Sequence, residues 1–167
     1  MAPGGDRTKR RLFLMRHAQA ASFAPGGGDR DRLLTGEGEE QARRVGVQLA
    51  GAGIERVLAS PAVRARQTAE ALGLPVQVTV VDALYNCSAA TLATTLARLP
   101  EYVRTALVVG HFPGVPGLVQ TLADRHTAGP DVSALARQFP PATVVELEFT
   151  DPWPDLHIAR LVAVRRP

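Results

Sequence analysis

The sequence holds one cysteine, Cys87, and no long apolar run. A single cysteine cannot form a disulfide within the chain, so we expect a fold without covalent cross-links in a reducing compartment, the cytoplasm. The apolar stretches are far shorter than the roughly 18 to 20 residues that span a bilayer, which predicts no membrane segment. The first eleven residues, MAPGGDRTKRR, lack the apolar core of a secretory signal. Disulfide-stabilised and membrane-spanning classes are therefore not expected.

Lysine is nearly absent: the sequence contains one lysine, Lys9, and eighteen arginines. The 19 basic and 16 acidic residues give a formal net charge of +3, but this excess lies at the chain ends. The charged residues there are Asp6, Arg7, Lys9, Arg10, Arg11, Arg165 and Arg166. The remainder carries 13 basic and 15 acidic residues, a net charge of −2. A nucleic-acid-binding domain concentrates basic charge on one face of its fold, so we predict no nucleic-acid partner and interpret these terminal residues as solvated, partly frayed ends.

The length of 167 residues and the hydrophobic content of 46% suit a single domain with its own core. We expect a disordered tail over 1–10 and one domain over 11–167. The expected strands are 11–15, 56–59, 76–81 and 105–109, with a terminal antiparallel hairpin of 143–149 and 156–164; the expected helices are 36–50, 61–72, 88–99 and 113–123. This alternation predicts an α/β fold, a three-layer α/β/α sandwich with a mostly parallel central sheet.

Two of these helices begin at residues typical of helix caps. Thr35 precedes a first turn with two glutamates, which favours it as an N-cap. Ser60 is followed by Pro61, the pattern of an N-cap with proline at the first helical position. We therefore predict that the helix after the second strand begins at Ser60.

Polar residues follow three of the expected strands at the point where each strand ends. Arg16 and His17 follow the first strand, Ser60 to Arg64 the second, and His111 the fourth. Ligands bind at the carboxyl ends of parallel strands in open α/β sheets. Two histidines, two arginines and a helix N-terminus at one edge indicate a pocket for a phosphate-like dianion. A bound anion would also offset the unfavourable position of Arg64 in the first turn of a helix.

These segments also resemble the motifs of a known family. RLFLMRHAQA resembles the Arg-His-Gly motif that opens the histidine phosphatase superfamily, and LASPAVRARQTAEAL and LVVGHFPGV resemble its second and third motifs. DRDRLLTGEGEEQA is similar to the Arg-x-Leu-Thr-x-x-Gly segment of SixA-type phosphohistidine phosphatases. The resemblance spans roughly residues 11 to 165 and implies a phosphoglycerate mutase-like fold.

The resemblance also implies a role for each matching residue. His17 would be the nucleophile that is transiently phosphorylated, while Arg16, Arg64 and His111 would hold the phosphoryl oxygens. Arg32 would be a further substrate-binding residue. Arginines and a second histidine can neutralise phosphoryl charge without a metal, and the sequence shows no cluster with metal-ligand spacing and no nucleotide-binding glycine motif. We therefore expect no metal and no cofactor.

The sequence departs from the family pattern at two positions. Ala18 replaces the glycine after the nucleophilic histidine, which is tolerable if its φ is negative. Asn86 stands where larger family members carry a glutamate that protonates an alcohol leaving group, and Asp82 is the nearest carboxylate. The general acid is thus unassigned, with Asp82 as the weak candidate. A site without an acid favours a good leaving group such as imidazole over an alkoxide.

The sequence therefore predicts a metal-independent phosphatase that works through a phosphohistidine intermediate, with protein phosphohistidine as the preferred substrate. The first alternative is a small-molecule or aryl phosphoester hydrolase of the same fold. The second is a non-catalytic module that binds phosphorylated proteins. His126 and His157 lie away from the expected strand ends and are interpreted as structural or surface residues. No feature of the sequence indicates an oligomeric state.

Overall fold

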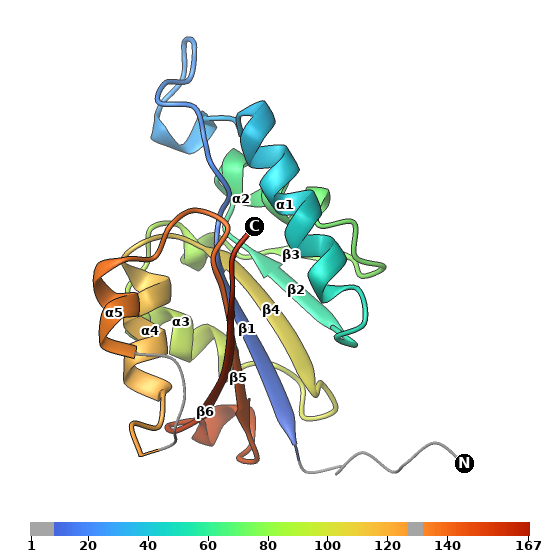
Figure 1. The fold of residues 1–167 in the computed structure, drawn as a ribbon, viewed down its shortest axis with the longest axis vertical. Coiled ribbons are helices and arrows are strands. Elements are labelled where there is room, and N and C mark those ends of the chain that lie inside the picture. The colour runs from blue at the N-terminus through green and yellow to red at the C-terminus, as the bar shows by residue number, and fades with distance from the viewer. Residues whose placement is uncertain (1–8, 127–131) are drawn as a thin grey trace.

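The computed structural model describes residues 9–126 and 132–167, and within them a six-stranded sheet forms the centre of the molecule (Figure 1). The strands are β1 (Arg10–Arg16), β2 (Arg56–Ala59), β3 (Val78–Val80), β4 (Thr105–Gly110), β5 (Val144–Phe149) and β6 (Arg160–Arg165). The α-helices are α1 (Gly36–Leu49), α2 (Val63–Ala71), α3 (Ala89–Leu96), α4 (Gly114–Leu122) and α5 (Val132–Arg137).

The strand order is β3-β2-β4-β1-β5-β6. The first four of these strands pair in parallel, whereas β5 pairs antiparallel with β1 and with β6. The predicted α/β class, with a mostly parallel sheet and a terminal antiparallel hairpin, is thus confirmed. In the parallel pair of β1 and β4, Arg16 lies opposite Gly110, so the two strands end at the same edge of the sheet.

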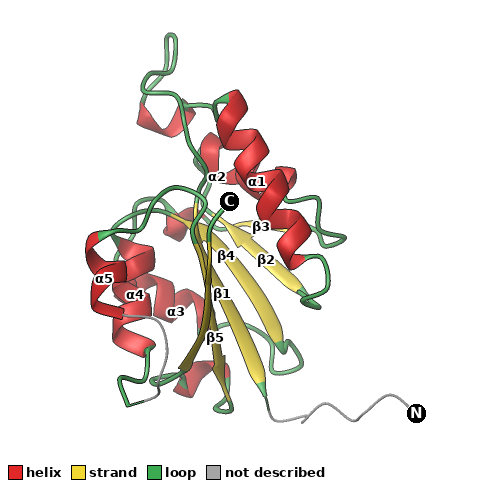
Figure 2. Cartoon of the chain, in the orientation of Figure 1, coloured by secondary structure: helices red, strands yellow, loops and turns green. Residues whose placement is uncertain are grey.

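Helices cover both faces of the sheet (Figure 2). Side chains alternate between the faces along a strand, and β1 shows this directly. Phe13 and Met15 pack in the hydrophobic cluster shared with α1 and α2, while Leu12 and Leu14 pack in the cluster shared with α3, α4 and α5. All four side chains are fully buried. A strand buried on both sides must be apolar throughout, which explains the unbroken apolar run.

The cap predictions differ in their outcome. Thr35 caps α1, since its side chain accepts the N–H of Gly38. The prediction that Ser60 begins the next helix is wrong, because α2 starts at Val63 with Ala62 as its N-cap residue. The Ser60 hydroxyl does accept the N–H of Ala62, but it also contacts a histidine of the site described below. The side chain therefore serves a turn and a polar cluster instead of a helix cap.

Three arginines near the chain ends, Arg10, Arg11 and Arg165, belong to the fold, which corrects their interpretation as frayed ends. Arg10 begins β1, is 2% exposed and donates to the main-chain oxygens of Thr150 and Asp151. Arg11 and Arg165 both pair with the buried carboxylate of Glu146 at 2.7 Å. Because Arg10 lies in a strand, the expected tail cannot extend to residue 10; its residues 1–8 lie outside the described part of the chain.

One further helix, α5, was not expected from the sequence. Its six residues are too few for a periodic apolar pattern, and it is held by Leu135, which packs in the same cluster as α4.

No helix in the described ranges has the length and hydropathy needed to cross a bilayer.

A glycine brings two connecting segments together next to the carboxyl ends of the strands. A Cβ at Gly114, the first residue of α4, would lie 2.2 Å from the carbonyl oxygen of Cys87. Only glycine allows this approach of α4 to the segment before α3. Tyr85, two residues before Cys87, lies beside His111, with their rings perpendicular and their centroids 5.8 Å apart.

Candidate active site

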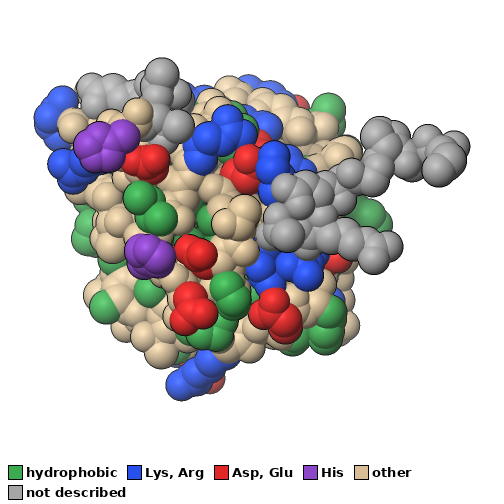
Figure 3. Space-filling model, turned by 90° about the horizontal axis from the view of Figure 1, so that it is seen from below, with side chains coloured by type: hydrophobic (Ala, Val, Ile, Leu, Met, Phe, Trp, Pro, Cys, Tyr) green, Lys and Arg blue, Asp and Glu red, His purple; other side chains and the backbone are tan. Residues whose placement is uncertain are grey.

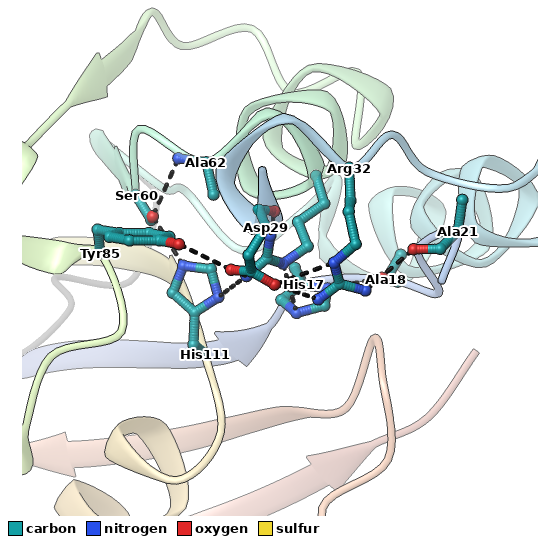
Figure 4. A network of polar contacts seen from close by, with 10 residues as sticks. His17, Ala18, Ala21, Asp29, Arg32, Ser60, Ala62, Tyr85 and His111 are labelled. Atoms are coloured by element: carbon teal, nitrogen blue, oxygen red, sulfur yellow. Dashed lines mark hydrogen bonds and ion pairs between the residues drawn. The ribbon is translucent and has the colours of Figure 1, made fainter. Parts of the chain in front are cut away.

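His17 and His111 meet where β1 and β4 end. Each is the first residue after its strand, and the N–H of His17 continues the ladder by donating to Gly110 O at 2.9 Å. The two rings are 5.2 Å apart between centroids and lie edge to face. The strands thus bring together two histidines that are 94 positions apart in the sequence, as Figure 4 shows.

The hydrogen bonds of His17 define its tautomer. Nδ1 lies 2.7 Å from the carbonyl oxygen of Ala18, which can only accept a hydrogen bond. Nε2 lies 3.2 Å from Nε of Arg64, which can only donate one. Nδ1 therefore carries the hydrogen and Nε2 carries the lone pair. Burial, above all, and then the charges of Arg64 and Arg16 lower the pKa of His17 to about 4. His17 is therefore a neutral imidazole at pH 7, with Nε2 as its nucleophilic atom.

Ala18 is compatible with this geometry. The described non-glycine residues with positive φ are Asn86 and Ala142, so Ala18 has the negative φ that a side chain tolerates. Its N–H donates to Thr68 Oγ1, and its side chain is fully buried. The condition set for an alanine at this position is met. Asn86 has a φ of 45°, and asparagine is one of the few residue types that adopt this left-handed conformation readily.

Ser60 and Arg64 hold His111 from opposite sides of its ring. Nε2 lies 2.7 Å from Ser60 Oγ, and Nδ1 lies 3.4 Å from a terminal nitrogen of Arg64. Because the guanidinium only donates, Nδ1 accepts and Nε2 carries the hydrogen. Burial, followed by the nearby His17 and Arg64, lowers the pKa of His111 to about 3. Both histidines are thus neutral, and each directs an unprotonated nitrogen toward Arg64.

The two predicted arginines reach this cluster in different ways. Arg64, the second residue of α2, is 2% exposed and contacts both histidines directly. Arg16 donates to the main-chain oxygen of Phe139 at 2.8 Å, and its guanidinium lies 5.5 Å from the ring centre of Phe112. Within the described ranges its buried Nε–H has no hydrogen-bond partner. Both charges act on His17, so this cluster concentrates positive charge that can receive an anion.

Arg32 lies in a second layer, together with two residues that the sequence analysis did not single out. Arg32 binds the carboxylate of Asp29, with Nε at 3.0 Å, and the same carboxylate accepts bonds from Arg64 and from the Tyr85 hydroxyl. Asp29 stands three residues before Arg32 in the segment that resembles the SixA branch. Its place in that segment was the one sign in the sequence that it could belong to the site. Tyr85 lies 56 positions away from Asp29.

The candidate acid Asp82 lies outside this cluster. Its carboxylate is 92% exposed, and its ion-pair partner in the described chain is Arg30, at 3.6 Å. The other two histidines are exposed and lie at the opposite end of the sheet, among acidic and basic side chains (Figure 3). His157 contacts Asp151 in the connection between β5 and β6, and His126 follows a bridge between Ala123 and Ala159. Within residues 9–126 and 132–167, no group of three or more His, Cys, Asp or Glu side chains could hold a metal.

The two buried histidines are expected to make the fold sensitive to mild acid. Above pH 6.5, both are neutral in the folded and the unfolded chain. As the pH falls from 6.5 toward 4, both histidines become protonated in the unfolded chain but stay neutral in the folded chain, because their pKa values there are lower. The free energy of unfolding therefore decreases. At pH 5.5 the loss should be about 1.4 kcal/mol for each histidine. Urea unfolding at pH 7 and 5.5 measures it. Wild type and His126→Ala should lose the same amount, and equal stability at both pH values would contradict the buried neutral assignment.

Two histidines and two arginines around the ends of parallel strands define a class of protein that handles phosphoryl groups. The family model of the histidine phosphatase superfamily (branch 1) matches residues 12–95, and the chain belongs to this superfamily. It has the phosphoglycerate mutase-like fold of its structural neighbours. Membership supports a phosphatase hydrolase.

Individual relatives point to one branch of the superfamily. Phosphohistidine phosphatase SixA of Escherichia coli K12 is 37% identical over 124 residues, which cover 70% of this chain and 76% of that protein. A structure from Nakamurella multipartita proposed to be a phosphohistidine phosphatase SixA matches with a TM-score of 0.83 and 35% identity, covering 99% of this chain and 98% of the other. The protein histidine phosphatase SixA complexed with tungstate matches with a TM-score of 0.76 and 29% identity over 93% and 96% of the two chains. The resemblance stated from the motifs is therefore confirmed.

Proposed function

We propose that this chain removes phosphate from protein phosphohistidine, without a metal ion, through a covalent intermediate on Nε2 of His17. The observation that carries the proposal is the defined tautomer of His17, whose Nε2 lone pair faces the guanidinium of Arg64. The SixA-like relatives support phosphohistidine as the substrate class. The single, half-buried Cys87, whose thiol pKa is raised by burial, supports a reducing compartment such as the cytoplasm.

In the first step, Nε2 of His17 attacks the phosphorus atom. The new P–N bond forms as the P–N bond of the substrate breaks, and the bonding electrons pass to the substrate nitrogen, so that a substrate ring protonated on its other nitrogen leaves as neutral imidazole. Arg64 and Arg16 neutralise the phosphoryl oxygens, which is the main demand of phosphoryl transfer. A dianion beside His111 favours its protonated form, which would add a further positive charge beside the phosphoryl oxygens.

In the second step, water attacks the phosphorus of phosphorylated His17. A P–O bond forms, the P–N bond breaks, and its electrons return to Nε2, while inorganic phosphate leaves with both protons of the attacking water. Neither step requires a strong acid when the leaving group is imidazole, since its conjugate acid titrates near neutrality. The Asp29 carboxyl does not supply one, because its hydrogen bond from Tyr85 and those from Arg32 and Arg64 hold its pKa well below the usual range. This chemistry favours phosphohistidine over alkyl phosphates.

The test is a comparison of substrates with the purified protein in EDTA. We expect phosphate release from a phosphohistidine-carrying protein and from an aryl phosphate, with an alkyl phosphate slower by at least about 100-fold because an alkoxide leaves poorly without an acid. A preference for the alkyl phosphate would instead favour the small-molecule hydrolase. Saturable binding of the phosphoprotein without phosphate release would indicate the non-catalytic module. Loss of all activity in EDTA, restored by a divalent metal, would overturn the metal-independent mechanism.

A further inference from the structure

Asp29 connects the glycine-rich loop to the centre of the pocket. It begins the short 3-10 helix Asp29–Asp31, and its half-exposed carboxylate lies between Arg32 and Tyr85 (Figure 4). Asp29 accepts two hydrogen bonds from the guanidinium of Arg64. Its main-chain oxygen accepts from one terminal nitrogen at 2.6 Å, and its Oδ2 accepts from the other at 3.0 Å.

These two contacts divide the guanidinium of Arg64 into two edges. The edge formed by Nε and one terminal nitrogen faces His17 and His111. The edge formed by the two terminal nitrogens faces Asp29. A guanidinium is planar and its donors have fixed directions, so holding the second edge determines where the first one points.

The carboxylate of Asp29 is itself held in place. Oδ2 accepts from Arg64 and, at 2.7 Å, from the Tyr85 hydroxyl, while Oδ1 accepts from Nε of Arg32 at 3.0 Å and forms an ion pair with a terminal nitrogen of the same side chain at 2.9 Å. A carboxylate offers about four acceptor positions, and hydrogen bonds from Arg64, Tyr85 and Arg32 occupy three of them. Asp29 is thus an ionised group, fixed by three side chains, that has no proton to donate.

We propose that Asp29 is a positioning residue: it holds Arg64 with one edge toward the two histidines, and its negative charge limits how tightly the pocket retains phosphate. This inference rests on the proposed function for its catalytic part only. A carboxylate bonded to the same guanidinium that receives the phosphoryl group repels that group. Without Asp29 the pocket would hold the anion more strongly but orient it less well.

The experiment measures phosphate affinity and turnover in parallel. In Asp29→Asn, the carboxamide keeps the shape but removes the charge. We expect inorganic phosphate to bind about tenfold more tightly by calorimetry and kcat with an aryl phosphate to fall by about tenfold or more. Tyr85→Phe, which removes one bond to Oδ2 but keeps the charge, should lower kcat by less and leave phosphate affinity within about twofold of wild type. Asp31→Asn is the matched control, because Asp31 lies in the same loop and bonds to Gly28 N; neither quantity should change.

A purely structural role predicts a different pattern. Weaker or unchanged phosphate binding in Asp29→Asn, or an unchanged kcat, would overturn the proposal, whatever the melting temperature does. Because phosphate binding does not require turnover, the result separates the two hypotheses. Tighter binding in a protein whose wild type releases no phosphate would contradict the proposed function and leave the effect of the Asp29 charge supported.

Discussion

Replacing His17 with alanine is expected to lower phosphate release from an aryl phosphate by about four orders of magnitude or more. The variant lacks the atom that forms the covalent intermediate, and no other described side chain offers an unprotonated nitrogen at the same place. His111 cannot substitute, because its unprotonated Nδ1 faces a different nitrogen of Arg64 and its ring centre lies 5.2 Å from that of His17. Initial rates at pH 7 measure the effect. Residual activity within tenfold of wild type would contradict a nucleophilic His17.

The control for this variant is His126→Ala. His126 is exposed, its main-chain N–H donates to the carboxylate of Asp124, and it lies at the far end of the sheet, so full activity is expected. Wild-type protein quenched during turnover should carry a phosphate that is stable in base and labile in acid. The tautomer places that phosphate on Nε2, which phosphorus NMR distinguishes from Nδ1; a signal from the Nδ1 isomer would contradict the assignment of the tautomer.

The gathering of His17, Arg64 and His111 could be predicted from the sequence, because each follows an apolar strand and parallel strands end at a common edge. The physical reason is general: the ladder between β1 and β4 fixes the register, and the register fixes which residues meet. The strands and the four longer helices could also be predicted, because the apolar periodicity that indicates each of them lies within one continuous segment of the sequence.

The second layer of the site could not be predicted in this way. Asp29 and Tyr85 lie in connections without periodicity, and their hydrogen bond joins residues that only the folded chain brings together. Ser60 shows a different limit. Its sequence pattern is that of a helix cap, but the fold places a buried imidazole against its hydroxyl, and the helix begins three residues later. A local rule predicts a local partner, and a tertiary partner can replace it.

The buried charges near the ends of the chain mark a third limit. Arg11 and Arg165 meet at Glu146 because β1, β5 and β6 are adjacent strands. Composition alone suggested solvated arginines, since arginine is rarely buried unless paired. The pairing partner is 135 positions away from Arg11, which no local pattern reveals.

Arg64→Lys is expected to lower kcat/KM by about 100-fold, and Arg64→Ala by about 1000-fold. Arg64 contacts both histidines with one edge and Asp29 with the other. Lysine supplies the charge but not the planar fork, so it can neutralise a phosphoryl group without holding it between two imidazoles. Most of the loss in the lysine variant should therefore be in kcat, whereas the alanine variant should also bind inorganic phosphate more weakly.

Arg66→Lys is the matched control, because Arg66 is an exposed arginine on the same helix and makes no contact with either histidine. Its kcat and KM should remain within twofold of wild type. Full activity in Arg64→Lys would mean that a positive charge alone suffices. It would contradict the inference that the geometry of the guanidinium contributes to catalysis. A lysine variant that loses affinity for phosphate but keeps kcat would have the same consequence. The two substitutions therefore separate the charge of Arg64 from its direction, which is the property that the pocket is built to fix.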